Sequence, residues 1–140
     1  MKYALIAMVA LAAGAWQKPA APPAVTLVGT VVDAACYMMH PAAASGGSHD
    51  ECGTACIARG VPIGIANESD KTLYFPSDGG KGLAAFLHQR VRATGTVTEK
   101  TEPMELTMPV GEHNQMIVRV EGGYKVIAIA TVAAAPAPVK

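Results

Sequence analysis

The chain has 140 residues, with 11 Lys and Arg, 11 Asp and Glu, and three cysteines. This length is typical of a single domain. The balance of basic and acidic residues excludes the sequence-wide positive charge that drives general binding to nucleic acids or anionic membranes. We therefore expect no nucleic-acid partner.

The first 15 residues are typical of a secretory signal peptide. Lys2 is followed by an apolar run that ends in the small residues Ala13-Gly14-Ala15. The run is shorter than the roughly 20 apolar residues of a membrane-spanning helix, so we expect no stable membrane insertion after cleavage. A periplasmic or secreted location follows from this pattern.

Proline and alanine dominate two further segments. Residues 16–24 are predicted to form a linker, and residues 133–140 a disordered tail, because neither segment offers side chains that could build a core. The folded domain is therefore expected over residues 25–132.

Short runs rich in β-branched residues predict a mainly β domain. Gly29 in the first run indicates a bulge or a sharp bend. The last two strands are predicted to pair as a closing hairpin across Gly122-Gly123, after a hairpin insertion over residues 101–115. The predicted strands cover residues 26–33, 61–66, 72–76, 90–98, 116–120 and 124–132, and the predicted helices residues 49–59 and 82–89.

A helix between the third and fourth strands of a small β-rich chain is typical of a five-stranded OB-like Greek-key barrel. We therefore predict a small barrel of this kind with one or two short helices. A two-sheet sandwich is the alternative architecture.

Chemistry-bearing side chains gather around the first predicted helix. Ser48 and Glu51 fit a capping box that would start this helix at His49. His49, Cys52 and Cys56 would then share one helix face, and Cys36 could fold back onto that face from the end of the first strand. Three thiols and an imidazole form a ligand set suited to zinc or copper. We predict a metal site made of Cys36, His49, Cys52 and Cys56.

Two other hypotheses remain open for the same residues. In an exported protein, Cys36 could form a disulfide with Cys52 or Cys56, which would leave one cysteine over in an interaction module whose partner is another periplasmic protein. Alternatively, Cys52 could be a nucleophile with His49 as its base. The chain contains no Cys-x-x-Cys motif, so a non-enzymatic role is favoured.

Further residues have simpler predicted roles. Methionines and His113 in the late insertion could form a second soft-metal site, but packing is the favoured role for them (Met104, Met108 and Met116). His88 is expected to be a cation at a helix end. Asp33 is expected to cap the loop that follows it, in preference to orienting His49.

The order of these residues resembles a pattern found in small exported bacterial proteins with an OB-like fold. It comprises Gly29-x-Val31-x-Asp33-x-x-Cys36, followed by His49-x-x-Cys52-x-x-x-Cys56-x-x-x-Gly60-x-Pro62-x-Gly64. The resemblance covers about residues 27–98 and the last strand, and the insertion at residues 101–115 departs from it. It implies the fold and export, and it carries no mechanism.

Overall fold

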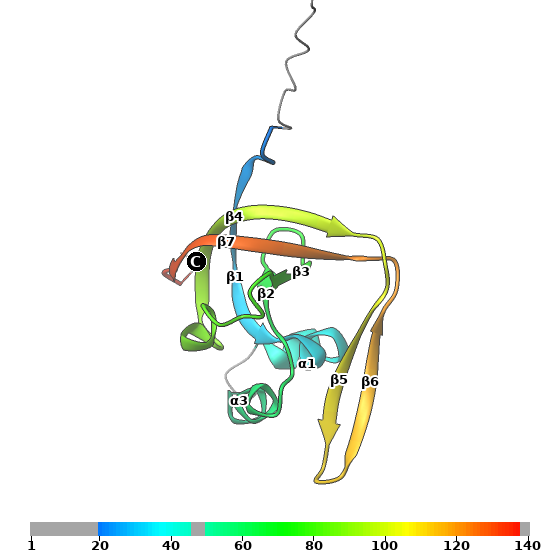
Figure 1. Cartoon of the computed structure of the whole chain (residues 1–140). Coiled ribbons are helices and arrows are strands. Elements are labelled where there is room, and N and C mark those ends of the chain that lie inside the picture. Colours follow the sequence, from blue (N-terminus) through cyan, green and yellow to red (C-terminus); the bar gives the residue numbers. More distant parts are fainter. Residues whose placement is uncertain (1–19, 46–49, 138–140) are drawn as a thin grey trace, which may run out of the picture.

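A computed structural model describes residues 20–45 and 50–137. The elements follow one another along the chain as shown in Figure 1. They are β1 (Ala24–Asp33), α1 (Ala34–Met39), α2 (Pro41–Ala44), α3 (Asp50–Ala58), β2 (Ile63–Asn67), β3 (Leu73–Pro76), the 3-10 helix η2 (Ala84–Phe86), β4 (Arg90–Lys100), β5 (Met104–Val110), β6 (Asn114–Val120) and β7 (Tyr124–Ala134).

Five strands close into a barrel in the order β1-β2-β3-β7-β4, and β4 returns to pair with β1. The β3–β7 pair is parallel, whereas the other four pairs are antiparallel. A mainly β chain closed in this way is a small OB-like barrel. The predicted fold class is therefore confirmed.

Strand β1 pairs with β4 along its first part and with β2 along its last part. Residues 24–30 pair with β4 and residues 29–33 pair with β2, so Gly29 lies where the strand passes from one neighbour to the other. A Cβ built on Gly29 would strike the carbonyl oxygen of Ala66 in β2. The bulge predicted at Gly29 is not observed, since the register runs through it without a shift, and the glycine instead allows a close backbone approach. The irregular register in the described barrel strands lies instead at Thr94/Gly95, between β4 and β7.

The helix predicted over residues 49–59 is observed as α3; its proposed first residue His49 and the capping residue Ser48 lie outside the described residues. Helices α1 and α2 occupy a stretch expected to be a loop. The helix predicted over residues 82–89 was wrong, because this segment contains only turns and the short η2. His88 has a φ of 63°, a left-handed backbone conformation that an α-helix does not accommodate.

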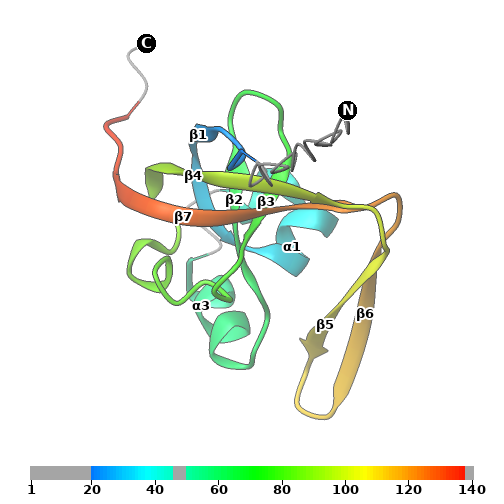
Figure 2. The same ribbon diagram turned by 45° about the horizontal axis from the view of Figure 1, so that its top comes forward.

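The predicted closing hairpin was also wrong. Strand β6 pairs with β5 along its whole length, and β7 pairs with β4 and β3 instead. The β5–β6 hairpin is therefore inserted between β4 and β7, and it extends from the barrel on the side of α1 (Figures 1 and 2). Gly122 and Gly123, both with positive φ, form the tight connection back into the barrel.

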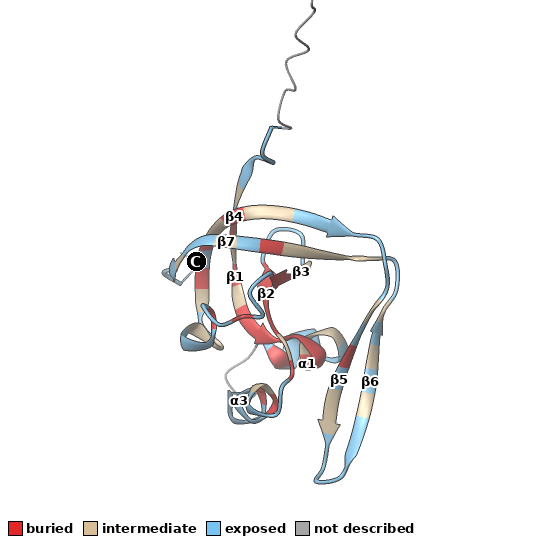
Figure 3. Cartoon of the chain, in the orientation of Figure 1, coloured by how far each residue is buried: buried red, intermediate tan, exposed pale blue. Residues whose placement is uncertain are grey.

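Among the described residues, the buried ones (red in Figure 3) form three hydrophobic clusters. Two clusters fill the barrel around Ile65 and Ile127. The third lies between α1, α3 and the inner face of β5, and it contains Cys36, Cys56 and Leu106. Within the described ranges, no helix has the length and apolar character needed to cross a bilayer.

Candidate metal centre

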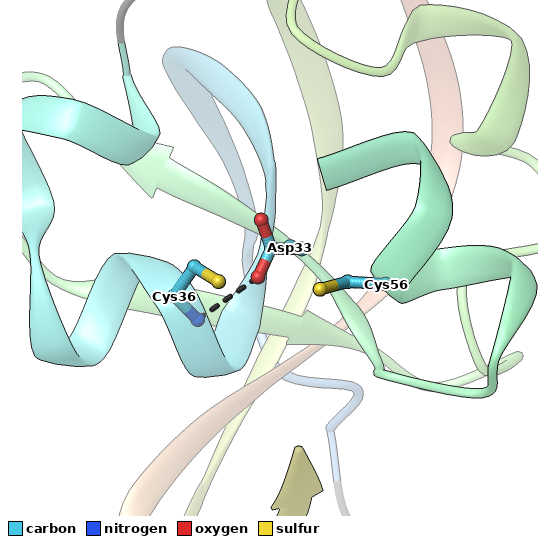
Figure 4. A group of neighbouring side chains, drawn as sticks. All are labelled: Asp33, Cys36 and Cys56. Carbon is cyan, nitrogen blue, oxygen red and sulfur yellow. Dashed lines mark hydrogen bonds between the residues drawn. The ribbon is translucent and has the colours of Figure 1, made fainter. Parts of the chain in front are cut away.

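Asp33, Cys36 and Cys56 converge at the junction of β1, α1 and α3 (Figure 4). One carboxylate oxygen and the two sulfur atoms all lie within 4.8 Å of one another. Asp33 is 0% exposed and each of the two cysteines is 8% exposed. This group of three could hold a metal ion.

Asp33 fixes the position of Cys36. Its backbone is extended, with φ of −71° and ψ of 129°, and it caps the N-terminus of α1. The backbone N–H of Cys36 donates to Oδ1 of Asp33 at 2.9 Å, as the dashed line in Figure 4 shows. Capping satisfies one of the free N–H groups of the first helical turn. The predicted capping role of Asp33 is thus observed, on a helix rather than on a loop.

Backbone hydrogen bonds position Cys56 beside Asp33 and Cys36. The carbonyl of Cys56 accepts from the N–H of Val61 at 3.1 Å, which ends α3 and turns the chain toward β2. The N–H of Ala34, next to Asp33, then donates to the carbonyl of Pro62 at 2.8 Å. The two cysteine-bearing helices are therefore tied together directly beside the cluster.

The surroundings of the two buried thiols keep them protonated when no cation is present. Burial raises the pKa of the Cys36 thiol, and the Asp33 carboxylate raises it further through hydrogen bonding and negative charge. Burial also raises the pKa of Cys56, with further contributions from Cys52 and Asp33. Such thiols are weak nucleophiles. A bound cation reverses this effect because its charge stabilises thiolates.

The four residues predicted as ligands have different positions. Cys36 and Cys56 meet, whereas Cys52 is exposed and is not a member of the group of three, although it lies one helical turn before Cys56 and influences its pKa. His49 lies outside the described residues. All three cysteines are free thiols in this structure.

Asp33 was missed as a ligand. The spacing Asp33-x-x-Cys36 does carry a signal, because an N-cap residue and the residue three positions later lie on the same side of a helix start. That inference required a helix at residues 34–39, and this stretch was expected to be a loop. The alanines and Tyr37 of α1 gave no apolar periodicity that would have indicated one.

His88, which was expected to lie at a helix end, lies in a turn after η2 and beside α3. A Cβ built on Gly53 of α3 would lie 2.8 Å from Nε2 of His88 and 3.2 Å from Oδ2 of Asp33, so both side chains lie against the same point of α3. Nδ1 of His88 lies 3.5 Å from a carboxylate oxygen of Asp50. The backbone N–H of His88 donates to the carbonyl of Val31 at 2.8 Å, which brings the loop before β4 to the end of β1.

A cavity of about 580 Å³ is lined in part by Tyr37 and Met38 of α1. Its size is that of a small-molecule site. Its walls include Tyr37 and the edge-to-face ring pair of Phe75 and Tyr124, whose centroids are 5.9 Å apart. Because Tyr37 directly follows Cys36, α1 forms a wall shared by the cavity and the cysteine cluster.

In comparisons with protein-family models, curated proteins and solved structures, nothing matches this chain.

Proposed function

We propose that this protein is an exported binding or accessory domain that holds a soft or borderline metal ion, zinc or copper, at Asp33, Cys36 and Cys56. The observation that carries the proposal is the convergence of ligand atoms from three buried residues, two at the junction of β1 and α1 and one on α3. Buried acidic groups at this separation repel one another when they ionise, and a cation removes that cost.

A fourth ligand would complete a tetrahedral centre. Cys52 is the candidate on α3, since it lies one turn before Cys56 and is accessible from solvent. His49 is the other candidate from the sequence pattern. An exposed fourth position suits a protein that takes up and releases its ion, because exchange requires access from solvent.

The N-terminal pattern of residues 1–15 supports an exported location, and the resemblance to small exported bacterial proteins agrees with it. In that compartment, the metal ion itself or a periplasmic protein that exchanges it would be the partner. The raised thiol pKa values make Cys36 and Cys56 weak nucleophiles, so the alternative of a thiol enzyme would depend on the exposed Cys52.

The test is to measure the metal content and zinc affinity of protein purified under reducing conditions. We expect one bound ion per chain, which is lost in the double variant Cys36→Ser/Cys56→Ser. Asp33→Asn should retain the cap on α1 while removing the ligand charge, and should therefore weaken zinc binding without unfolding the protein. Glu51→Gln, an exposed acidic residue of the first turn of α3, is the matched control and should bind normally.

The rival function is an interaction module tied by a disulfide. The proximity of the two sulfur atoms favours pairing of Cys36 with Cys56 over pairing of Cys36 with Cys52. Absence of bound metal, together with a Cys36–Cys56 disulfide in protein isolated from an oxidising compartment, would overturn the metal proposal in favour of this module.

A further inference from the structure

Met108 of the inserted hairpin reaches the cysteine cluster. The sulfur of Met108 lies 3.7 Å from the sulfur of Cys36, although the two residues are 72 positions apart in the chain. Met108 lies on the inner face of β5, the face that also carries Met104 and the buried Leu106. This face packs against the cluster of buried residues that contains both Cys36 and Cys56.

We propose that Met108 is a sulfur ligand of this centre and makes it selective for copper in its +1 state over zinc. The inference rests on the proposed function and identifies the ion that the site takes. Three sulfur atoms, from Cys36, Cys56 and Met108, would form the soft side of the centre, and the carboxylate of Asp33 would form its hard side.

The separation of the two sulfur atoms suits a shared ion. Two sulfur ligands bound tetrahedrally to one ion at about 2.3 Å lie about 3.8 Å apart. The observed 3.7 Å between Cys36 and Met108 therefore requires little movement of either side chain for both to bind the same ion.

The ligand chemistry separates the two metals. Zinc in proteins is bound by thiolate, imidazole and carboxylate, whereas thioethers together with thiolates select Cu(I). Asp33 and Met108 thus favour different ions at one centre. The Asp33 carboxylate is expected to contribute to the affinity for zinc, and the Met108 thioether to the affinity for Cu(I).

The competing explanation is that Met108 only fills space between the hairpin and α1, as methionine often does in irregular cores. Met104 provides a matched control for this explanation. It lies on the same strand and the same face, and it packs against the same cluster of buried residues. A role in packing predicts similar effects for Met104→Leu and Met108→Leu, whereas a role as a ligand predicts an effect of Met108→Leu alone.

The experiment measures Cu(I) affinity by competition with a chromophoric Cu(I) chelator under anaerobic, reducing conditions, and zinc affinity by competition with a zinc chelator. Loss of an outer-shell partner of a metal site already costs about 10- to 100-fold in affinity. We therefore expect Met108→Leu to weaken Cu(I) binding by at least about tenfold and to leave zinc binding unchanged. Met104→Leu should change neither affinity.

Equal Cu(I) affinity in wild type and Met108→Leu, with binding lost in Cys36→Ser/Cys56→Ser, would overturn the role of Met108 and leave the proposed metal site intact. Failure of the wild type to bind either ion would overturn both proposals. If Met108→Leu does not fold, carbon-13 NMR of methyl-labelled methionine in the wild type provides the measurement. Addition of Cu(I) should then shift the Met108 methyl signal more than that of Met104, and more than addition of zinc does; equal shifts with the two ions, or an unshifted Met108 signal, would contradict the inference.

Discussion

The imidazole of His88 lies directly against the backbone of Gly53, where a Cβ would be 2.8 Å from its Nε2 atom. Gly53 is buried on α3 between Cys52 and Cys56. The absence of a side chain at position 53 therefore lets α3 approach the loop before β4 and the Asp33 carboxylate. This approach places Cys56 beside Cys36.

The first prediction concerns the Gly53–His88 pair. Gly53→Ala should destabilise the protein by about 1 kcal/mol, because overpacking costs more than the gain in helix propensity of about 1 kcal/mol. In a His88→Ala background the same change should stabilise the protein, since the imidazole that the methyl group meets is then gone. Chemical unfolding of the four proteins in this double-mutant cycle measures the coupling. Additive effects would show that the two residues do not constrain each other.

The second prediction concerns thiol reactivity. Cys52 is exposed, whereas burial raises the pKa of both Cys36 and Cys56. At neutral pH, iodoacetamide should modify one cysteine of the metal-free native protein quickly and the other two only after unfolding. Mass spectrometry of the alkylated protein checks this result. The control variant Cys52→Ser should lose the fast phase, and a fast phase that persists in it would contradict the buried placement of the other two thiols.

The third prediction concerns Asp70 in the turn between β2 and β3. Burial opposes ionisation of Asp70, yet hydrogen bonds from the Thr72 N–H, the Tyr74 hydroxyl and the Asn67 amide together lower its pKa below the ordinary value. Asp70→Asn should therefore cost about 1.5 kcal/mol at neutral pH, at the low end of the range for charged hydrogen bonds because the side chain is partly exposed.

The pH dependence of this effect has a definite sign. A lowered pKa in the folded state stabilises the protein above the ordinary pKa of about 3.9, and this stabilisation is lost as the pH falls through the lower folded value. The difference in unfolding free energy between wild type and Asp70→Asn should thus shrink between pH 5 and pH 3, as urea unfolding would measure. Glu102→Gln, at an exposed carboxylate, serves as the control. A difference independent of pH would refute the role of the Asp70 charge.

The fourth prediction concerns Gly29. Gly29→Ala should destabilise the barrel by about 2 to 3 kcal/mol, because the added methyl group meets the backbone carbonyl of Ala66, which cannot rotate away. Gly82→Ala is the matched control, since its nearest neighbour is a side-chain oxygen of Asp78 at an ordinary 3.7 Å. The control should stay within about 0.5 kcal/mol of wild type in chemical unfolding. Equal effects of the two changes would refute the close approach of β1 to β2.

The sequence by itself determined the fold class and the position of most barrel strands. Alternation of buried and exposed positions, with Val91 and Ala93 as the clearest example in β4, arises locally from the two-residue period of a strand. The same holds for α3 and its end near Gly60, whose positive φ of 93° suits glycine. Local physics sufficed for these elements because the required interactions lie within a few residues of one another.

Only the tertiary structure decided the composition of the site. Cys36 and Cys56 come from separate helices, His88 follows η2, and Met108 lies 72 residues beyond Cys36, so no periodicity links them. Strand β7 pairs with β3 and β4, while β6 pairs with β5 in the hairpin that carries Met108 to α1. Contacts between distant segments follow from closure of the whole barrel. Sequence spacing therefore indicated two of the three clustered residues as ligands, and the fold supplied Asp33 and the thioether beside them.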